Sequence, residues 1–173
     1  MQMQSLHSLL PELAVDESEV LYDLQSDERL PPGDYGIAEH YCADPDCDCR
    51  RALLTVVSSH GGGTPWASIQ LGWEDASFYA AQLDLDDPSD PAALALKGPS
   101  LSATEPQSEH ADFLLDVVMA EVLTDDFVAK LKRHYALFKE AIPVERRPRS
   151  NPEASAQERR KRRQAIKKKR KKR

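Results

Sequence analysis

The feature that most limits how this chain can fold is the uneven distribution of its charges. Residues 146–173 carry 15 Lys and Arg but only 2 Asp and Glu, a net charge of +13. Residues 1–145 carry 8 basic and 27 acidic side chains, a net charge of −19, so the whole chain has a formal net charge of −6. An asymmetry of this size is typical of a folded domain that carries an interaction tail.

The basic segment lacks the apolar residues that a folded core requires. Ile166 is the one large apolar side chain in residues 158–173, and residues 148–157 are polar with two prolines. Such a segment cannot bury enough apolar surface to offset the entropy lost on ordering. We therefore predict an acidic globular domain over residues 1–145 and a disordered basic tail over residues 146–173.

The acidic part has the pattern of an α+β domain. Aromatic and β-branched residues alternate or cluster in 34–41, 51–59 and 66–73, which predicts three strands. The short connections between these strands favour a small antiparallel β-meander. Apolar residues at helical spacing predict two C-terminal helices over 107–123 and 124–142 that pack against the meander, with Thr124 as a cap and Pro143 as a stop.

The other segments are less regular. Residues 5–24 predict short helical pieces interrupted by Pro11, and residues 77–85 fit either a short helix or a strand. Residues 86–106 contain four prolines and predict a loop with one helical turn at 92–96.

The beginning of the chain has no positive segment followed by a long apolar run, which argues against a secretory signal. The longest uncharged apolar run, residues 52–57, is far too short to span a bilayer. Three cysteines are an odd number and cannot all pair within one chain. We therefore expect a cytoplasmic protein without a membrane span, in which the cysteines are thiols or metal ligands.

The segment between the first two predicted strands carries the clearest chemical signal. Cys42, Cys47 and Cys49 follow the spacing C-x4-C-x-C, so one short loop can direct three thiolates to one ion. Zinc is the expected cofactor because it prefers soft sulfur ligands in a tetrahedral shell. The fourth ligand must come from elsewhere, with His134 and His40 as the predicted residues and His60 and His110 as alternatives. Free thiols, or redox chemistry among the three cysteines, remain alternatives to a metal.

Several segments of the chain resemble a known family. They are residues 35–42, 72–74, 106–109 and 133–139, together with a loop of the form Tyr-Cys-x-Asp-Pro-x-Cys-Asp-Cys-Arg-Arg at 41–51. This set is similar to a family of uncharacterised bacterial proteins that often end in the cysteine-rich zinc motif of the SecA carboxyl terminus. That motif is absent here, because no Cys-Pro-Cys-Gly segment follows Pro148. The resemblance implies no established activity.

The basic tail predicts binding to a polyanion, with nucleic acid or the ribosome as the expected partner. The predicted contacts are the clustered cations of the tail, namely Arg159, Arg160, Lys161, Arg162, Arg163, Lys167, Lys168, Lys169, Arg170, Lys171, Lys172 and Arg173. Three alternatives are association of the tail with the acidic domain, attraction to an anionic membrane surface, and a nuclear address.

These features predict a non-enzymatic interaction protein with a zinc site and a polyanion-binding tail. The first alternative is an enzyme, either a metal-dependent hydrolase or a thiol redox enzyme that uses the cysteine loop. A second alternative is a structural partner of one other protein. The number of metal ligands separates the first two hypotheses, because structural zinc sites have four protein ligands and catalytic sites keep one position open.

Overall fold

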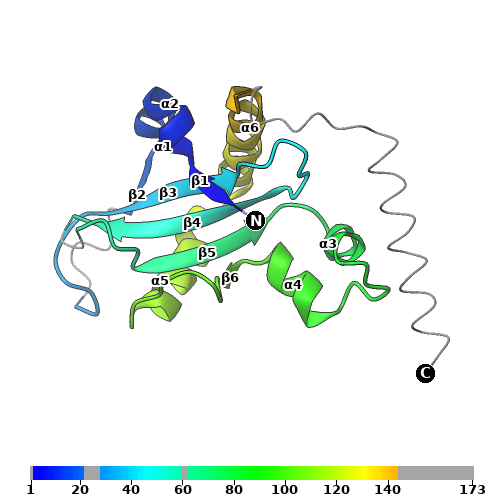
Figure 1. The fold of residues 1–173 in the computed structure, drawn as a ribbon. Coiled ribbons are helices and arrows are strands. Elements are labelled where there is room, and N and C mark those ends of the chain that lie inside the picture. Colours follow the sequence, from blue (N-terminus) through cyan, green and yellow to red (C-terminus); the bar gives the residue numbers. More distant parts are fainter. Residues whose placement is uncertain (1, 22–27, 60–61, 144–173) are drawn as a thin grey trace. The chain divides into compact units, whose positions relative to one another are not determined.

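The structure is a computed structural model that describes residues 2–21, 28–59 and 62–143. The chain separates into two units, Met1–Ile142 and Pro143–Arg173. Residues 144–173 lie outside the described residues, so the predicted disordered tail does too, and the description below concerns the first unit (Figure 1).

The predicted α+β fold is confirmed, with an antiparallel meander at its centre (Figure 1). Strands β3 (Tyr35–Cys42), β4 (Arg51–Ser58) and β5 (Ala67–Gly72) pair in sequence order. Ile37 lies opposite Val56, and Leu54 lies opposite Ile69, so the apolar positions of neighbouring strands share one face. The period-2 pattern of these strands thus fixes both the register and the buried face of the sheet.

The sheet is larger than the predicted meander. Its order is β1-β3-β4-β5-β6, and β2 also pairs with β3. Strands β1 (Met3–Ser5) and β2 (Glu19–Val20) both lie along β3, and two short helices, α1 (Leu6–Leu9) and α2 (Pro11–Asp16), lie between them in the chain. The predicted N-terminal helical pieces are therefore present, but strands of two or three residues carry no readable periodicity.

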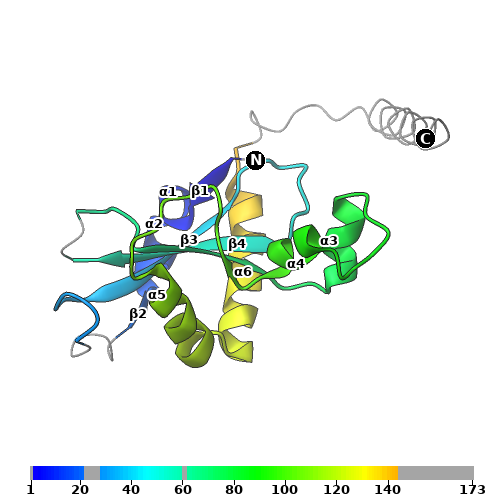
Figure 2. The same cartoon turned by 90° about the horizontal axis from the view of Figure 1, so that it is seen from below.

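The two predicted C-terminal helices cover the apolar face of the sheet. They are α5 (Ala111–Val117), which continues as a π-helical turn at Val118–Val122, and α6 (Asp125–Ala141). The Thr124 hydroxyl accepts from the Phe127 N–H at 3.2 Å and caps α6 as predicted. Figure 2 shows α5 and the N-terminal part of α6 on one side of the sheet. Buried residues of both helices and of the three long strands form one apolar core.

A helical pair lies beyond the end of β5. It consists of α3 (Ala76–Gln82) and α4 (Pro91–Lys97), followed by β6 (Ser100–Leu101). Tyr79, Ala80 and Ala93 form a small core of their own between these helices. The segment at 77–85 is thus mainly helical, and α4 is longer than the single turn that we predicted. Within the described part of the chain, no helix combines the length and the apolar character needed to span a bilayer.

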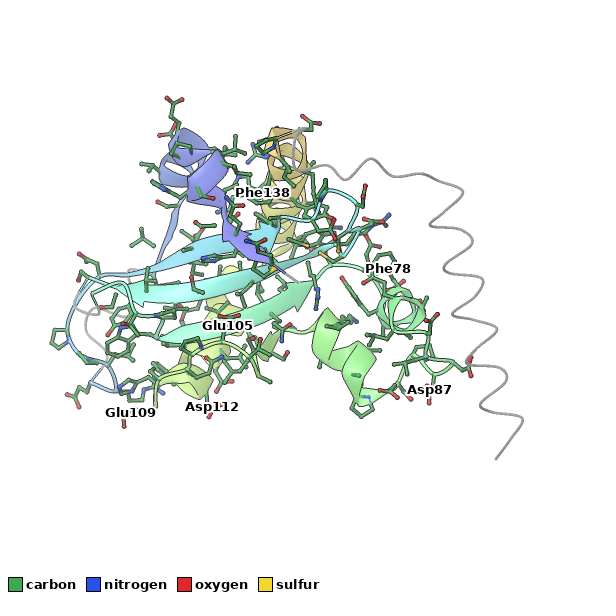
Figure 3. The ribbon with its side chains drawn as sticks, in the orientation of Figure 1. Phe78, Asp87, Glu105, Glu109, Asp112 and Phe138 are labelled. Atoms are coloured by element: carbon green, nitrogen blue, oxygen red, sulfur yellow. The ribbon has the colours of Figure 1, made fainter. Side chains whose placement is uncertain are left out.

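Acidic side chains are distributed over the outside of this unit. Figure 3 shows the carboxylates of Asp87, Glu109 and Asp112 directed away from the sheet, and all three residues are exposed. Phe138, in contrast, is fully buried, and its ring centroid lies 5.5 Å from that of Tyr41 on β3. These three negative charges therefore lie on the surface, where water solvates them.

Candidate metal centre

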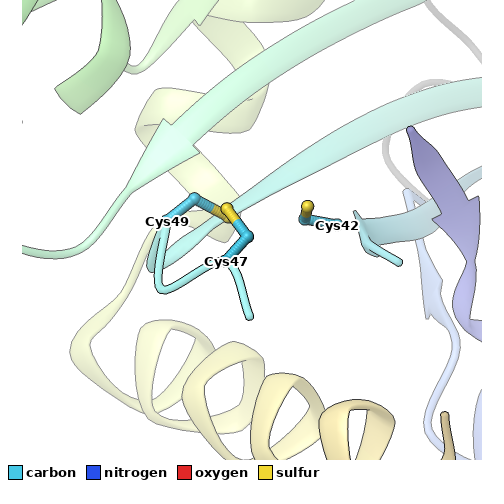
Figure 4. Close-up of side chains that lie close together, drawn as sticks. All are labelled: Cys42, Cys47 and Cys49. Atoms are coloured by element: carbon cyan, nitrogen blue, oxygen red, sulfur yellow. The ribbon is translucent and has the colours of Figure 1, made fainter. Parts of the chain in front are cut away.

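The three cysteines converge where β3 passes into β4 (Figure 4). Cys42 is the last residue of β3, and Cys47 and Cys49 lie in the loop that precedes Arg51 of β4. The three sulfur atoms all lie within 4.8 Å of one another, and no disulfide joins them. Cys42 and Cys49 are buried, whereas Cys47 is half-buried.

The loop between the cysteines is folded by its own polar groups. The Asp46 N–H donates to Asp44 Oδ1 at 3.0 Å, and the Cys47 N–H donates to the Asp44 carbonyl at 3.2 Å. Asp44 therefore makes the turn that returns the chain toward Cys42. Arg50 has a φ of 47°, a left-handed conformation that redirects the backbone before β4 begins.

Helices on both sides hold this loop by its carbonyl groups. From α6, the Lys139 ammonium donates to the Asp44 carbonyl at 2.6 Å, and the Tyr135 hydroxyl donates to the Cys47 carbonyl at 3.3 Å. From the α3 side, the Tyr79 hydroxyl donates to the Arg50 carbonyl at 2.8 Å. The sulfur positions thus depend on α3 and α6 as well as on the loop itself.

The three thiols differ in their readiness to ionise. The hydrogen bond from the Cys49 thiol is the largest influence on Cys42 and lowers the pKa of Cys42 to about 5, an effect to which the nearby Lys139 charge adds. The same hydrogen bond raises the pKa of Cys49, since Cys49 is its donor. Burial raises the pKa of Cys47. The metal-free centre therefore holds one thiolate at neutral pH, and a metal ion would displace the other two thiol protons.

This donor set fits a soft or borderline metal ion. Three sulfurs from one loop can occupy three corners of a tetrahedron, and thiolates favour Zn²⁺ over hard ions such as Mg²⁺ and Ca²⁺. The cluster can therefore bind a metal ion, although the structure does not identify which one.

The structure does not bring His134 to these sulfurs. His134 lies on α6, and its side chain is 1% exposed. Its Nδ1 lies 2.7 Å from Glu39 Oε2, and its Nε2 lies 3.2 Å from Glu17 Oε2. Both ring nitrogens thus face carboxylates, which leaves neither one free to bind an ion at the cysteine loop.

His40 is also outside the sulfur group in the described part of the chain. It lies on β3 opposite Leu53 of β4 and Ser5 of β1. Its Nδ1 is buried and has no hydrogen-bond partner among the described residues, and burial lowers the pKa of its ring. Of the predicted metal ligands, the three cysteines are therefore brought together, and the two histidines are not.

Sequence reasoning allowed for a hydrogen-bonded His134 at the edge of the core but did not identify Glu39 and Glu17 as its partners. The Tyr41 hydroxyl donates to Glu39 Oε2 at 2.7 Å, and Glu39 is only 8% exposed. Burial, followed by the negative charge of Glu39, raises the pKa of Tyr41. One signal was available, because Glu39 occupies an inward position in the alternation of β3 between the buried residues Ile37 and Tyr41.

The predicted polyanion-binding residues of the tail, from Arg159 to Arg173, lie outside the described residues. Comparison with known proteins found no matching family model, no matching curated protein and no matching solved structure. The resemblance to a bacterial family with this cysteine loop therefore stays a prediction.

Proposed function

We propose that this protein is a zinc-binding interaction protein whose basic tail binds a polyanion, with nucleic acid or the ribosome as the partner. The observation that carries the proposal is the convergence of three sulfurs within 4.8 Å in one loop. We expect zinc to be the bound ion because it favours thiolates and a tetrahedral shell.

The role of the metal in this proposal is structural. The cysteine loop contacts α6 through Lys139 and Tyr135 and the α3 side through Tyr79. A metal bound to the three sulfurs would fix the loop carbonyls that these side chains contact. Metal binding would in this way stabilise the end of the sheet together with both helices.

The tail supplies the second half of the proposal from its composition. It carries a net charge of +13 and is attached to a domain of net charge −19 that would itself repel phosphate. A polyanion bound through such a tail is held by charge and without strong sequence preference. The folded domain would then be the part that contacts a protein partner.

The metal half of the proposal is tested by native mass spectrometry of the full chain. We expect one zinc ion per chain, and we expect C42S, C47S and C49S each to lose it. The matched control is A43S, which adds a hydroxyl to the same loop without removing a sulfur and should keep the metal. A wild-type chain that stays metal-free after zinc loading would contradict the proposal.

The tail half is tested separately, by electrophoretic mobility shift with a duplex of mixed sequence. The full chain should bind, and a chain that lacks residues 157–173 should not. Binding that survives this deletion would show that the tail is not the site.

A second candidate is a metal-dependent hydrolase or a thiol redox enzyme. It is favoured by the number of ligands, because the described residues contribute three cysteines and catalytic zinc sites commonly have three protein ligands. Hydrolysis of an activated ester by the zinc-loaded chain, lost in C47S and retained in A43S, would favour this candidate over the structural role.

A further inference from the structure

We infer that the metal held by Cys42, Cys47 and Cys49 keeps one coordination position that an imidazole nitrogen from outside the chain can take. The inference rests on the proposed function, since it requires a bound metal. It goes further by giving the metal centre a ligand-binding role and by naming the chemistry of that ligand.

The first step is a count of the soft and borderline donors that the chain contains. It has three cysteines, all in the cluster, and five histidines. Residues 1, 22–27 and 144–173 contain neither cysteine nor histidine, so they bring no thiol or imidazole. A fourth ligand of this kind from the same chain must therefore be one of the five histidines.

Four of these histidines have described positions, and none of them joins the sulfur group. His134 faces two carboxylates, as described above. The ring of His110 stacks on Trp66 with the centroids 5.3 Å apart. His7 is exposed on α1, and His40 lies on β3.

The fifth histidine, His60, follows Ser59, which lies at the end of β4 that is farther from the cysteine loop. The cysteine loop enters β4 at Arg51, and β4 runs for 8 residues to Ser58. At about 3.3 Å per residue, the two ends of this strand lie about 23 Å apart. Ser59 is fixed at the far end, where its N–H donates to the Asp34 carbonyl at 3.0 Å. An imidazole attached one residue later cannot span that distance.

The second step concerns access and charge. Cys42 and Cys49 are buried and Cys47 is half-buried, so an external ligand approaches on the side of Cys47. The exposed residues on this stretch of the loop are Asp44, Asp46 and Asp48. Asp48 pairs with Arg50 at 3.0 Å, so the carboxylates of Asp44 and Asp46 are the ones that repel an anionic ligand and favour a neutral one. A neutral imidazole combines the absence of charge with the borderline softness that zinc accepts beside thiolates.

The experiment uses the full chain loaded with Co²⁺, whose visible bands report the geometry and ligands of the site. Addition of imidazole should shift these bands in a saturable way, while the thiolate-to-cobalt charge-transfer band keeps its intensity. The blocked tripeptide Lys-His-Lys is titrated in parallel. Tighter binding of the peptide identifies a basic protein segment as the source of the ligand, and equal binding identifies a small molecule.

Two results would overturn the inference while the proposed function stands. One is a cobalt-loaded chain whose bands do not respond to imidazole. The other is an H40A variant whose visible bands differ from those of the wild type before any ligand is added, because His40 would then be the fourth ligand. A chain that binds no cobalt at all would contradict both the proposed function and this inference.

Discussion

At the scale of single residues, His134 is notable because its side chain is fully buried and both of its ring nitrogens contact carboxylates. It is buried between Glu39 of β3 and Glu17, which also pairs with Arg133. Charges in a protein interior are tolerated only when they are paired and hydrogen-bonded. The imidazole is therefore a shared partner of two carboxylates, one on β3 and one at the C-terminal end of α2.

Replacement of this imidazole should be costly. We expect H134A to lower the free energy of unfolding by roughly 3–5 kcal/mol, because it leaves the buried Glu39 carboxylate without its imidazole partner. Urea denaturation followed by circular dichroism measures the change. The matched control is K132A, an exposed position on the same helix, which should change the stability by less than about 0.5 kcal/mol. Equal stabilities of the two variants would contradict this view of the network.

The unequal thiols of the metal-free centre predict a pH dependence with a defined sign. Cys42 has a pKa of about 5 in the folded chain, whereas an ordinary thiol has a pKa of about 8.5. Between these values the unfolded chain binds a proton that the folded chain does not, so stability should rise with pH across this window. The raised pKa values of Cys47 and Cys49 act in the opposite direction above about pH 8.5.

Chemical denaturation of the metal-free chain between pH 5 and pH 8 measures this effect. The wild type should gain stability over this range relative to C42S, which has no thiol to ionise at that position. C42S with the same slope as the wild type would show that Cys42 does not carry the thiolate.

At the scale of elements, the metal centre depends on helices that contribute no sulfur. Tyr135 and Lys139 lie one turn apart on α6, and both donate to carbonyls of the cysteine loop. Loss of a hydrogen-bonding partner in the outer shell of a metal site typically weakens metal binding by about 10–100-fold. The loop is therefore one part of a site that is assembled from three elements.

Removal of the Tyr135 hydroxyl tests whether zinc affinity depends on α6. We expect Y135F to weaken zinc binding by about tenfold, since the Cys47 carbonyl loses its donor. Competition with a chromophoric chelator gives the affinity. K132M, on the same helix and exposed, serves as the control and should bind zinc like the wild type. An unchanged affinity in Y135F would mean that the loop holds its shape without α6.

The contact between β5 and α3 offers a second test at this scale. A Cβ at Gly72 would lie 2.2 Å from the Tyr79 hydroxyl oxygen, so G72A must displace the hydroxyl that donates to the Arg50 carbonyl. We expect G72A to lose about 1–3 kcal/mol of stability and to bind zinc more weakly. At Gly36 the nearest atom to an added Cβ is 3.4 Å away, so G36A is the control and should be tolerated better.

Much of this arrangement could be predicted from local patterns. The alternation in β3 and β5, the helical spacing of α6 and the Thr124 cap are properties of neighbouring residues, and the structure confirms the elements that they predict. The pairing of β1 and β2 with β3 joins residues far apart in sequence through two or three hydrogen-bonded positions, which leave no periodic signal. The same reason explains why the surroundings of the histidines could not be predicted. His134 and Glu39 are far apart in the chain, so the sequence does not indicate that α6 directs His134 toward Glu39 and away from the sulfurs.

At the scale of the whole molecule, the charge division separates two kinds of chemistry. The acidic unit exposes carboxylates such as those of Asp87, Glu109 and Asp112 and brings its three thiols together where β3 passes into β4, while residues 146–173 contain 15 basic side chains. Binding of the tail to duplex DNA should depend steeply on salt. If about eight phosphates are neutralised, the logarithm of the association constant should fall with the logarithm of salt concentration with a slope near −7.

This slope is measured by fluorescence anisotropy of a labelled duplex at several salt concentrations. K167A/K168A/K169A should reduce the slope by about 3, because three phosphate contacts are removed. A slope near zero for the wild type would contradict an electrostatic tail.

The central claim is that three cysteines of one loop hold a zinc ion, and X-ray absorption spectroscopy at the zinc edge tests it most directly. The zinc-loaded full chain should show three sulfur neighbours at about 2.3 Å and one nitrogen or oxygen neighbour at about 2.0–2.2 Å. A first shell without sulfur, or with fewer than three sulfur atoms, would contradict it.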